Sequence, residues 1–192
     1  MKLLKLTIHN IASIEDAVLD FENGPLAEDT RFLICRPLGS GKTTILDSIC
    51  LALYNTTPRL KSAANEIYTD SYADFKTTRD DGGVSIGDPR MLMRRGAASA
   101  FVELVFTDRN DNVLTALWSC SKARERSDGK IQDVKWTLSD SLGNGICSRK
   151  SETEREIVSR IGLTFEQFSR TTMLAQGDFT RFLKAKDSEK SD

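Results

Sequence analysis

The chain has 192 residues, of which 39% are hydrophobic and 29% charged, as expected for a soluble globular protein with one ordinary core. Its net charge of −1 excludes a general attraction to nucleic acid, so any DNA contact needs a local patch or a surface from another chain. No run approaches the ~18 apolar residues of a membrane span, and Met1 leads directly into a strand pattern, so we expect neither a membrane segment nor a signal peptide.

The first part of the chain combines strand patterns with one helical pattern. Apolar and polar residues alternate over 4–9, and a partner strand is expected over 17–21. A short buried strand is expected over 31–35. Apolar residues then recur at helical spacing over 42–54, and this helix is expected to end at Asn55.

The middle of the chain predicts an antiparallel sheet. Residues 56–90 are polar and rich in Gly, Asp and Thr, so an irregular excursion is expected there. Strand patterns over 100–106 and 113–120 predict a hairpin, and a third strand is expected over 129–138. A turn is expected at 142–145.

Two capping-box patterns, S/T-x-x-E/Q, mark helices near the C-terminus. Ser151 begins one pattern, which predicts a helix to about Arg160, and Thr164 begins the other. The pattern over 170–175 predicts a strand, and a further helix is expected to start near Phe179.

Cysteine and histidine usage indicates no disulfide or metal site. The four cysteines have no paired spacing, which is typical of a reduced, cytoplasmic protein: Cys35, Cys50, Cys120 and Cys147. Cys35 and Cys50 fall in apolar runs and are interpreted as small buried hydrophobic residues. His9 is the only histidine, and a hydrogen-bonded strand histidine is favoured over a ligand.

Residues 90–135 carry a mild positive excess, nine Lys or Arg against six Asp or Glu. Such a stretch could contact DNA, but an ordinary solvated hairpin face is favoured on charge alone.

Residues 32–44 have the layout of a phosphate-binding P-loop: an apolar strand, a glycine-containing turn, and Lys-Thr opening a helix. Gly39 and Gly41 let the backbone approach phosphate, Lys42 would reach the β and γ phosphates, and the Thr43 hydroxyl would ligate Mg²⁺. The predicted nucleotide contacts of this loop are Arg36, Gly39, Ser40, Gly41, Lys42, Thr43 and Thr44.

Arg36 replaces the first glycine of the P-loop pattern. An arginine at this strand exit adds bulk and a cation, which could either contact phosphate or occupy its space. Pro37 removes one backbone N–H, and Leu38 is apolar where a small polar residue is common. The sequence therefore leaves two states of the loop open, a working ATP site and a degenerate one.

Four stretches together resemble the SbcC-type members of the ABC/SMC-like DNA-repair ATPases. These are the opening hairpin (1–21), the P-loop with the following helix (39–60), the Arg94-Arg95-Gly96 stretch to 103, and the stretch from 173 to 185. The likeness spans nearly the whole chain, and the set of motifs is far more specific than the P-loop alone.

This resemblance implies an α/β fold, namely the P-loop NTPase half-domain of an ABC-ATPase-like N-terminal lobe with a mixed or antiparallel β subdomain. Residues 1–178 would form the N-terminal half of an ATPase head, and 179–192 the root of a coiled-coil helix. Gln176 would act with Lys42 in catalysis by sensing the γ-phosphate and Mg²⁺. Asn10 and the residues after it would lie near the nucleotide, with Arg94 and Arg95 near its base and sugar.

The resemblance also implies partners. They are the C-terminal half of the same head, a second SbcC-type head in a homodimer, an SbcD-type nuclease and double-stranded DNA. The Walker B acids, signature motif and switch histidine would belong to the C-terminal half, so the chain alone is expected to hydrolyse ATP very slowly or not at all. Two alternatives are a folded remnant that no longer binds ATP and a small P-loop phosphotransferase.

Overall fold

The computed structural model describes residues 1–23, 27, 41–62, 84, 85 and 87–172. The chain divides into two compact units, Met1–Gly162 and Leu163–Asp192, which are treated separately.

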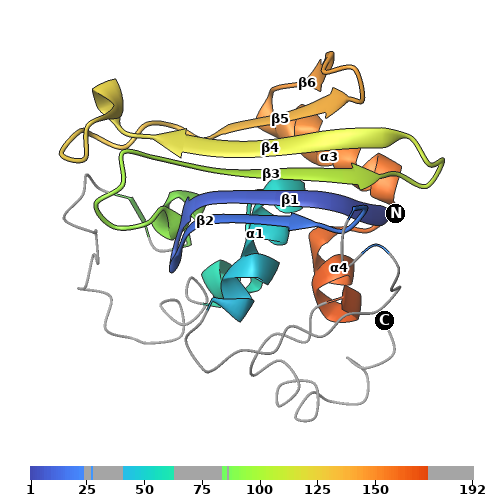
Figure 1. Cartoon of the computed structure of the whole chain (residues 1–192), viewed down its shortest axis with the longest axis horizontal. Helices are drawn as coiled ribbons and strands as arrows, with labels where there is room; N and C mark the ends of the chain where they lie inside the picture. Colours follow the sequence, from blue (N-terminus) through green and yellow to red (C-terminus); the bar gives the residue numbers. More distant parts are fainter. Residues whose placement is uncertain (24–26, 28–40, 63–83, 86, 173–192) are drawn as a thin grey trace, which may run out of the picture. The chain divides into compact units, whose positions relative to one another are not determined.

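A six-stranded antiparallel sheet forms the framework of the first unit, in the order β2-β1-β3-β4-β5-β6 (Figure 1). The strands are β1 Lys2–Ile11, β2 Ile14–Asp20, β3 Ser99–Thr107, β4 Val113–Ser121, β5 Lys135–Asp140 and β6 Gly145–Cys147. The expected opening hairpin, the 100–106/113–120 hairpin and the α/β class with an antiparallel subdomain are thereby confirmed.

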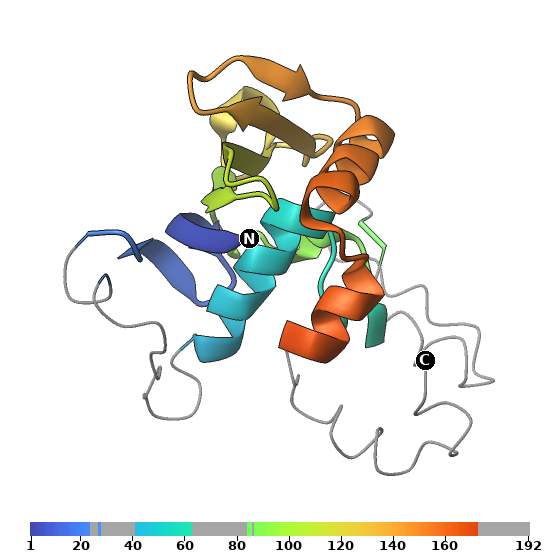
Figure 2. The ribbon, with the colours of Figure 1, turned by 90° about the vertical axis from the view of Figure 1, so that its right-hand side faces the viewer.

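One face of this sheet is buried under two helices, α1 Lys42–Tyr54 and α3 Lys150–Ile161. Figure 2 shows both helices on the same side of the sheet. Side chains alternate between the faces, so strict alternation of buried and partly exposed residues runs along β3 and β4. The buried face includes Leu6, Ile8, Val102, Leu104, Phe106, Ala116, Trp118, Trp136 and Leu138.

Two tryptophans of the sheet bind the C-terminal end of α1. Trp118 and Trp136 are cross-strand partners on β4 and β5, and both are at most 2% exposed. The Trp118 indole N–H donates to Asn55 Oδ1 at 2.7 Å, and the Trp136 indole N–H donates to the Ala52 carbonyl at 2.7 Å. Because buried polar groups are costly unless paired, these two bonds fix the position of the helix end on the sheet.

The end of α1 agrees with the prediction, whereas the segment after it does not. Asn55 adopts a left-handed conformation (φ 50°), and its amide donates to the Leu51 carbonyl at 3.0 Å, closing the helix. Residues 58–62 are then helical, with Thr57 Oγ1 accepting from the Leu60 amide at 3.2 Å. The expectation of irregular structure over 56–90 is therefore wrong for this part and for the 3-10 turn Pro89–Leu92.

The third predicted strand starts later than expected, at Lys135 rather than Gly129. Residues before it form a loop in which Gly129 lies so close to Ala123 that a Cβ would be 2.4 Å from the Ala123 carbonyl oxygen. Only an isolated bridge, Lys122 to Ile131, pairs this stretch with another described segment. The predicted turn at 142–145 does reverse the chain, and it leads into the short strand β6.

The first predicted capping box is wrong. Helix α3 begins at Lys150, with Arg149 as its N-cap and no side-chain cap, so Ser151 lies inside the first turn. The Arg149 carbonyl accepts from the amides of Glu152 and Thr153 at 2.9 Å, so backbone bonds begin the helix before Ser151. Thr153 is fully buried, and its hydroxyl donates to the Trp136 carbonyl at 3.3 Å, which ties α3 to β5.

The second capping box is confirmed within the second unit, where α4 spans Phe165–Thr172. The Thr164 amide donates to Gln167 Oε1 at 3.0 Å, and the Gln167 amide donates to Thr164 Oγ1 at 3.3 Å. The strand predicted over 170–175 is wrong for 170–172, which are helical. The remaining predictions at 31–35, at 173–175, for the helix from Phe179 and for a coiled-coil root at 179–192 fall outside the described residues.

Among the helices of the described part of the chain, none is long and apolar enough to cross a membrane. Among the described cysteines none forms a disulfide, and Cys50 and Cys120 are buried whereas Cys147 is partly exposed.

Replacing Trp136 with Phe should lower the free energy of unfolding by about 1–3 kcal/mol, because the Ala52 carbonyl would remain buried without its donor. Urea unfolding measures the loss. Val18→Ala, at a 62% exposed side chain, is the control and should change stability by no more than about 0.5 kcal/mol. A Trp136→Phe variant as stable as this control would contradict the assigned role of the indole.

Candidate nucleotide-binding site

The N-terminus of α1 is built to attract an anion. Gly41 is the N-cap in a left-handed conformation (φ 91°, ψ 10°), and its carbonyl accepts from the Ile45 amide at 3.1 Å as the helix begins. Glycine has no side chain to cap the first-turn amides, and this turn carries no acidic residue. The amides and the positive end of the helix dipole therefore favour a negatively charged ligand.

The turn between β1 and β2 lies directly against this helix end. A Cβ on Gly41 would lie 3.1 Å from Ser13 Oγ and 3.3 Å from Ile14 Cγ1. The Ser13 and Thr44 hydroxyl oxygens are 3.3 Å apart. Glycine at 41 is thus required twice, by its backbone conformation and by the close approach of the turn. This tight approach at the helix end fits the described part of a phosphate cradle.

The β1–β2 turn is itself held in an uncommon conformation. Asn10 (φ 52°) and Ala12 (φ 46°) both lie in the left-handed region. Two backbone bonds to the last residue of the 3-10 turn and to the segment after it hold them there. The Ala12 amide donates to the Leu92 carbonyl at 2.7 Å, and the Arg94 amide donates to the Asn10 carbonyl at 2.8 Å.

The Arg94 side chain continues the same support. Its Nη1 donates to the Ser13 carbonyl at 3.0 Å, and its Nη2 lies 3.6 Å from Glu15 Oε2. Arg94 therefore contacts the turn that contacts Gly41, whereas the next residue, Arg95, is exposed.

The structure brings several of the predicted site residues together around the start of α1, namely Asn10, Gly41, Lys42, Thr43, Thr44 and Arg94. Thr43 is exposed, while Thr44 is 4% exposed with its hydroxyl beside Ser13. Arg36, Gly39, Ser40 and Gln176 lie outside the described residues. The roles of all these residues toward a nucleotide remain predictions.

The resemblance places Asn10 and the residues after it near the nucleotide, but it does not name Ser13 or Ile14, whose side chains lie against Gly41. Nothing in the local pattern marks them, because their contact with the helix depends on the pairing of β1 and β2 in the sheet. The position of the turn opposite a glycine-led helix is the signal that could have found them.

A buried ion pair follows one turn further along α1. Asp47 is 1% exposed, and its Oδ2 lies 2.7 Å from Arg59 Nη2. Burial raises the pKa of the Asp47 carboxyl, and the charge of Arg59 and a hydrogen bond from Thr57 oppose this only in part. Burial and the Asp47 charge also raise the pKa of the Cys50 thiol to about 12, so Cys50 is not a thiolate nucleophile.

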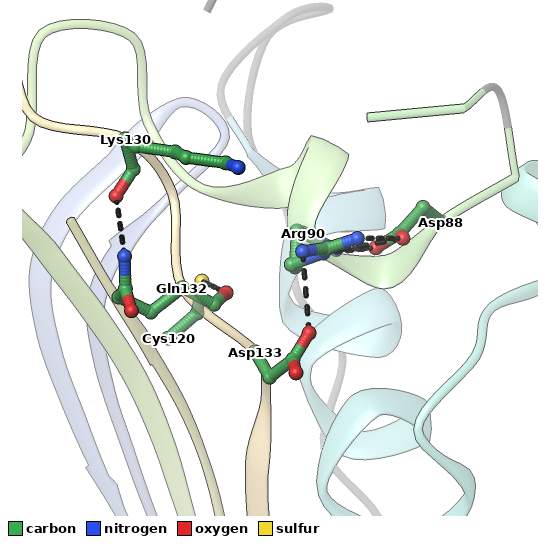
Figure 3. A network of polar contacts seen from close by, with 6 residues as sticks. All are labelled: Asp88, Arg90, Cys120, Lys130, Gln132 and Asp133. Carbon is green, nitrogen blue, oxygen red and sulfur yellow. Dashed lines mark hydrogen bonds and ion pairs between the residues drawn. The ribbon is translucent and has the colours of Figure 1, made fainter. Parts of the chain in front are cut away.

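Many of the cations in the stretch 90–135 are already engaged within the protein. Figure 3 shows Arg90 between Asp88, whose Oδ2 it approaches to 2.7 Å, and Asp133 at 3.5 Å. Lys122 donates to the Ser127 carbonyl, and Arg109 donates to the carbonyls of Ile161 and Gly162 at the end of α3. This pairing favours the interpretation of the stretch as an ordinary protein face.

Comparison with known proteins assigns the chain to a family of domains. Residues 5–192 match the AAA domain family, and the chain belongs to that family. Its P-loop and six-stranded sheet therefore belong to a nucleotide-binding ATPase class of domain.

Within that class the chain is similar to SbcC, a component of the nuclease SbcCD. It is 35% identical to SbcC from Pseudomonas aeruginosa over 193 residues, covering 99% of this chain and 15% of the relative. For Rhodobacter capsulatus the values are 35%, 100% and 15%, and for Treponema pallidum 30%, 100% and 16%. The chain thus spans about 15% of the length of these curated relatives.

Gly41→Ala should destabilise the protein more than Gly143→Ala does. Both glycines have positive φ (91° and 81°), but a Cβ at Gly143 would meet nothing within 4 Å. The Gly143 variant is therefore expected to cost about 1 kcal/mol, and the Gly41 variant about 1 kcal/mol more. Chemical unfolding of the two variants measures the difference, and equal losses would contradict a tight contact between the turn and the helix.

Asp47→Asn should change how stability depends on pH. Because the folded pKa of Asp47 lies above its value of 3.8 in the unfolded chain, its contribution is fully present below 3.8 and is lost as pH rises through the folded pKa. The stability of the original protein relative to Asp47→Asn should therefore fall as pH rises above about 4. Urea titrations of both proteins test this, and a relative gain with rising pH would refute the direction.

Proposed function

We propose that this chain is the N-terminal half of the ATPase head of an SbcCD-type nuclease complex and that it binds Mg-ATP at the start of α1. The observation that carries the proposal is Gly41, left-handed at the N-cap of α1 and pressed against the β1–β2 turn. Family membership and the similarity to SbcC support the same site.

Within this proposal each predicted residue has a chemical role. Lys42 contacts the β and γ phosphates, the first-turn amides hold phosphate oxygens, and the Thr43 hydroxyl is a ligand for Mg²⁺. Bound Mg²⁺ neutralises charge on the outer phosphates. Gln176 senses the γ-phosphate, and Asn10, Arg94 and Arg95 lie on the side of the base and sugar.

Hydrolysis then needs the C-terminal half of the head, because an acidic base and the signature motif are assigned to it. Two such heads would enclose two ATP molecules, and their closing and opening would control access of double-stranded DNA to an SbcD-type nuclease. The similarity to SbcC supports this assembly, and a cytoplasmic location is consistent with it.

Arg36 is the observation that favours the second candidate, a folded remnant that has lost ATP binding. The third candidate, a small phosphotransferase, needs a second parallel strand ending in an aspartate. The strand pairs in the described part of the chain are all antiparallel, which argues against it.

Calorimetric titration with Mg-ATP separates the first two candidates. We expect the original chain to bind, and Lys42→Ala to bind at least about tenfold more weakly because it loses the phosphate cation. Val18→Ala, at the exposed edge strand β2, serves as the matched control and should bind as the original does. Binding restored only by Arg36→Gly would support the remnant and refute ATP binding by this chain.

The purified chain should release phosphate from ATP at close to the background rate, even where it binds nucleotide. The reason is that the residues expected to activate water belong to the other half of the head. A phosphate-release assay with Lys42→Ala as the blank measures this. Turnover well above that blank would contradict the half-head assignment.

A further inference from the structure

Asn10 makes two side-chain hydrogen bonds at the start of the β1–β2 turn. Its Nδ2 donates to the Ser99 carbonyl at 3.0 Å and lies 2.9 Å from His9 Nε2. A carbonyl oxygen only accepts hydrogen bonds, so Ser99 requires the amide nitrogen of Asn10, not its oxygen, on this side.

The orientation of the Asn10 amide determines the protonation of His9. With one Nδ2 proton on Ser99, the other points at His9 Nε2, which must then be an unprotonated acceptor. The neutral ring therefore carries its proton on Nδ1, where Asp16 Oδ1 accepts it at 2.6 Å. The ring also stacks on Phe101, with centroids 5.3 Å apart.

We propose that His9 is a positioning residue for the nucleotide site, which acts through Asn10 and loses this action when it is protonated. A proton on Nε2 would place two donors against each other, and Asn10 could relieve this only by giving up its bond to Ser99. Asn10 is left-handed, and its carbonyl accepts from the Arg94 amide. A change there alters the turn whose Ser13 meets Gly41 and Thr44.

Other charged groups also face the imidazole. Asp16 on β2 pairs with the ring at Nδ1, and Glu103 lies on the same face of β3 two residues from Phe101. Arg94 lies beyond Asn10 and is paired with Glu15. A proton on His9 Nε2 therefore affects the turn through the facing N–H donors of His9 and Asn10, whatever the net effect of these charges.

The proposal rests on the proposed function for its effect on ATP, but its central contact can be tested without nucleotide. Because His9 is the only histidine, its ring nitrogens give an unambiguous long-range ¹H–¹⁵N spectrum. At pH 8 we expect a protonated Nδ1 and an unprotonated Nε2. As pH falls, the side-chain amide of Asn10 and the backbone amide of Gly41 should shift with the same midpoint as His9. A proton on Nε2 at pH 8, or a Gly41 amide that ignores the titration, would overturn the proposal.

Nucleotide affinity provides the second readout. In His9→Gln, the amide oxygen stands near the position of Nε2 and accepts without titrating, whereas His9→Leu cannot accept. At pH 8 we expect His9→Gln to bind Mg-ATP as the original does and His9→Leu to bind about three- to tenfold more weakly.

The ratio of the dissociation constants of the original chain and His9→Gln cancels the titration of the nucleotide itself. This ratio should rise about three- to tenfold on acidification from pH 8 to pH 5.5, because only the original chain can lose the acceptor at residue 9. A constant ratio would overturn the proposal. If no variant binds ATP at any pH, the proposed function fails, and the NMR titration alone decides whether His9 positions the turn.

Discussion

The two indole hydrogen bonds between the sheet and the end of α1 are the constraint on which the site depends. Trp118 and Trp136 bind the helix at Asn55 and Ala52, so its C-terminal end is fixed by directional bonds in a buried setting. Since a helix is a rigid rod over 13 residues, its N-terminal end is fixed as well. The β1–β2 turn can then meet that end in one register, because β1 belongs to the same sheet.

In this arrangement the sheet and α1 support a β1–β2 turn whose left-handed backbone conformations are unfavourable by themselves. Asn10 and Ala12 in the β1–β2 turn and Gly41 at the facing helix end all adopt left-handed conformations. Such conformations persist where the surroundings determine them more strongly than the local chain does. Here the turn is held in its left-handed conformation by the backbone bonds of Ala12 and Arg94 and by the contact of Ser13 with the helix.

The elements predictable from the sequence are those whose pattern is local. Alternation located β3 and β4, helical spacing located α1, and the capping box at Thr164 forms as its motif predicts. The equally good motif at Ser151 does not cap α3, because the Arg149 carbonyl already accepts from the amides of Glu152 and Thr153 and the helix begins two residues earlier. For the site, the local motif identifies Gly41 to Thr44. Ser13 falls within the stretch after Asn10 that the resemblance places near the nucleotide, but it is not identified individually, because strand pairing, not spacing, brings it to Gly41.

The same distinction separates what the P-loop motif determines from what the fold determines. The amides and the positive dipole end of a helix N-terminus attract any phosphate, so the motif explains the class of ligand and little more. The side of the site opposite the helix end is formed by the β1–β2 turn. A chain of hydrogen bonds supports this turn, from Ser99 through Asn10 to His9 and Asp16. No motif encodes this chain of hydrogen bonds, and each link requires a particular donor or acceptor. Protonation of the His9 imidazole can thus alter the contact at the helix end without any change in the loop residues themselves.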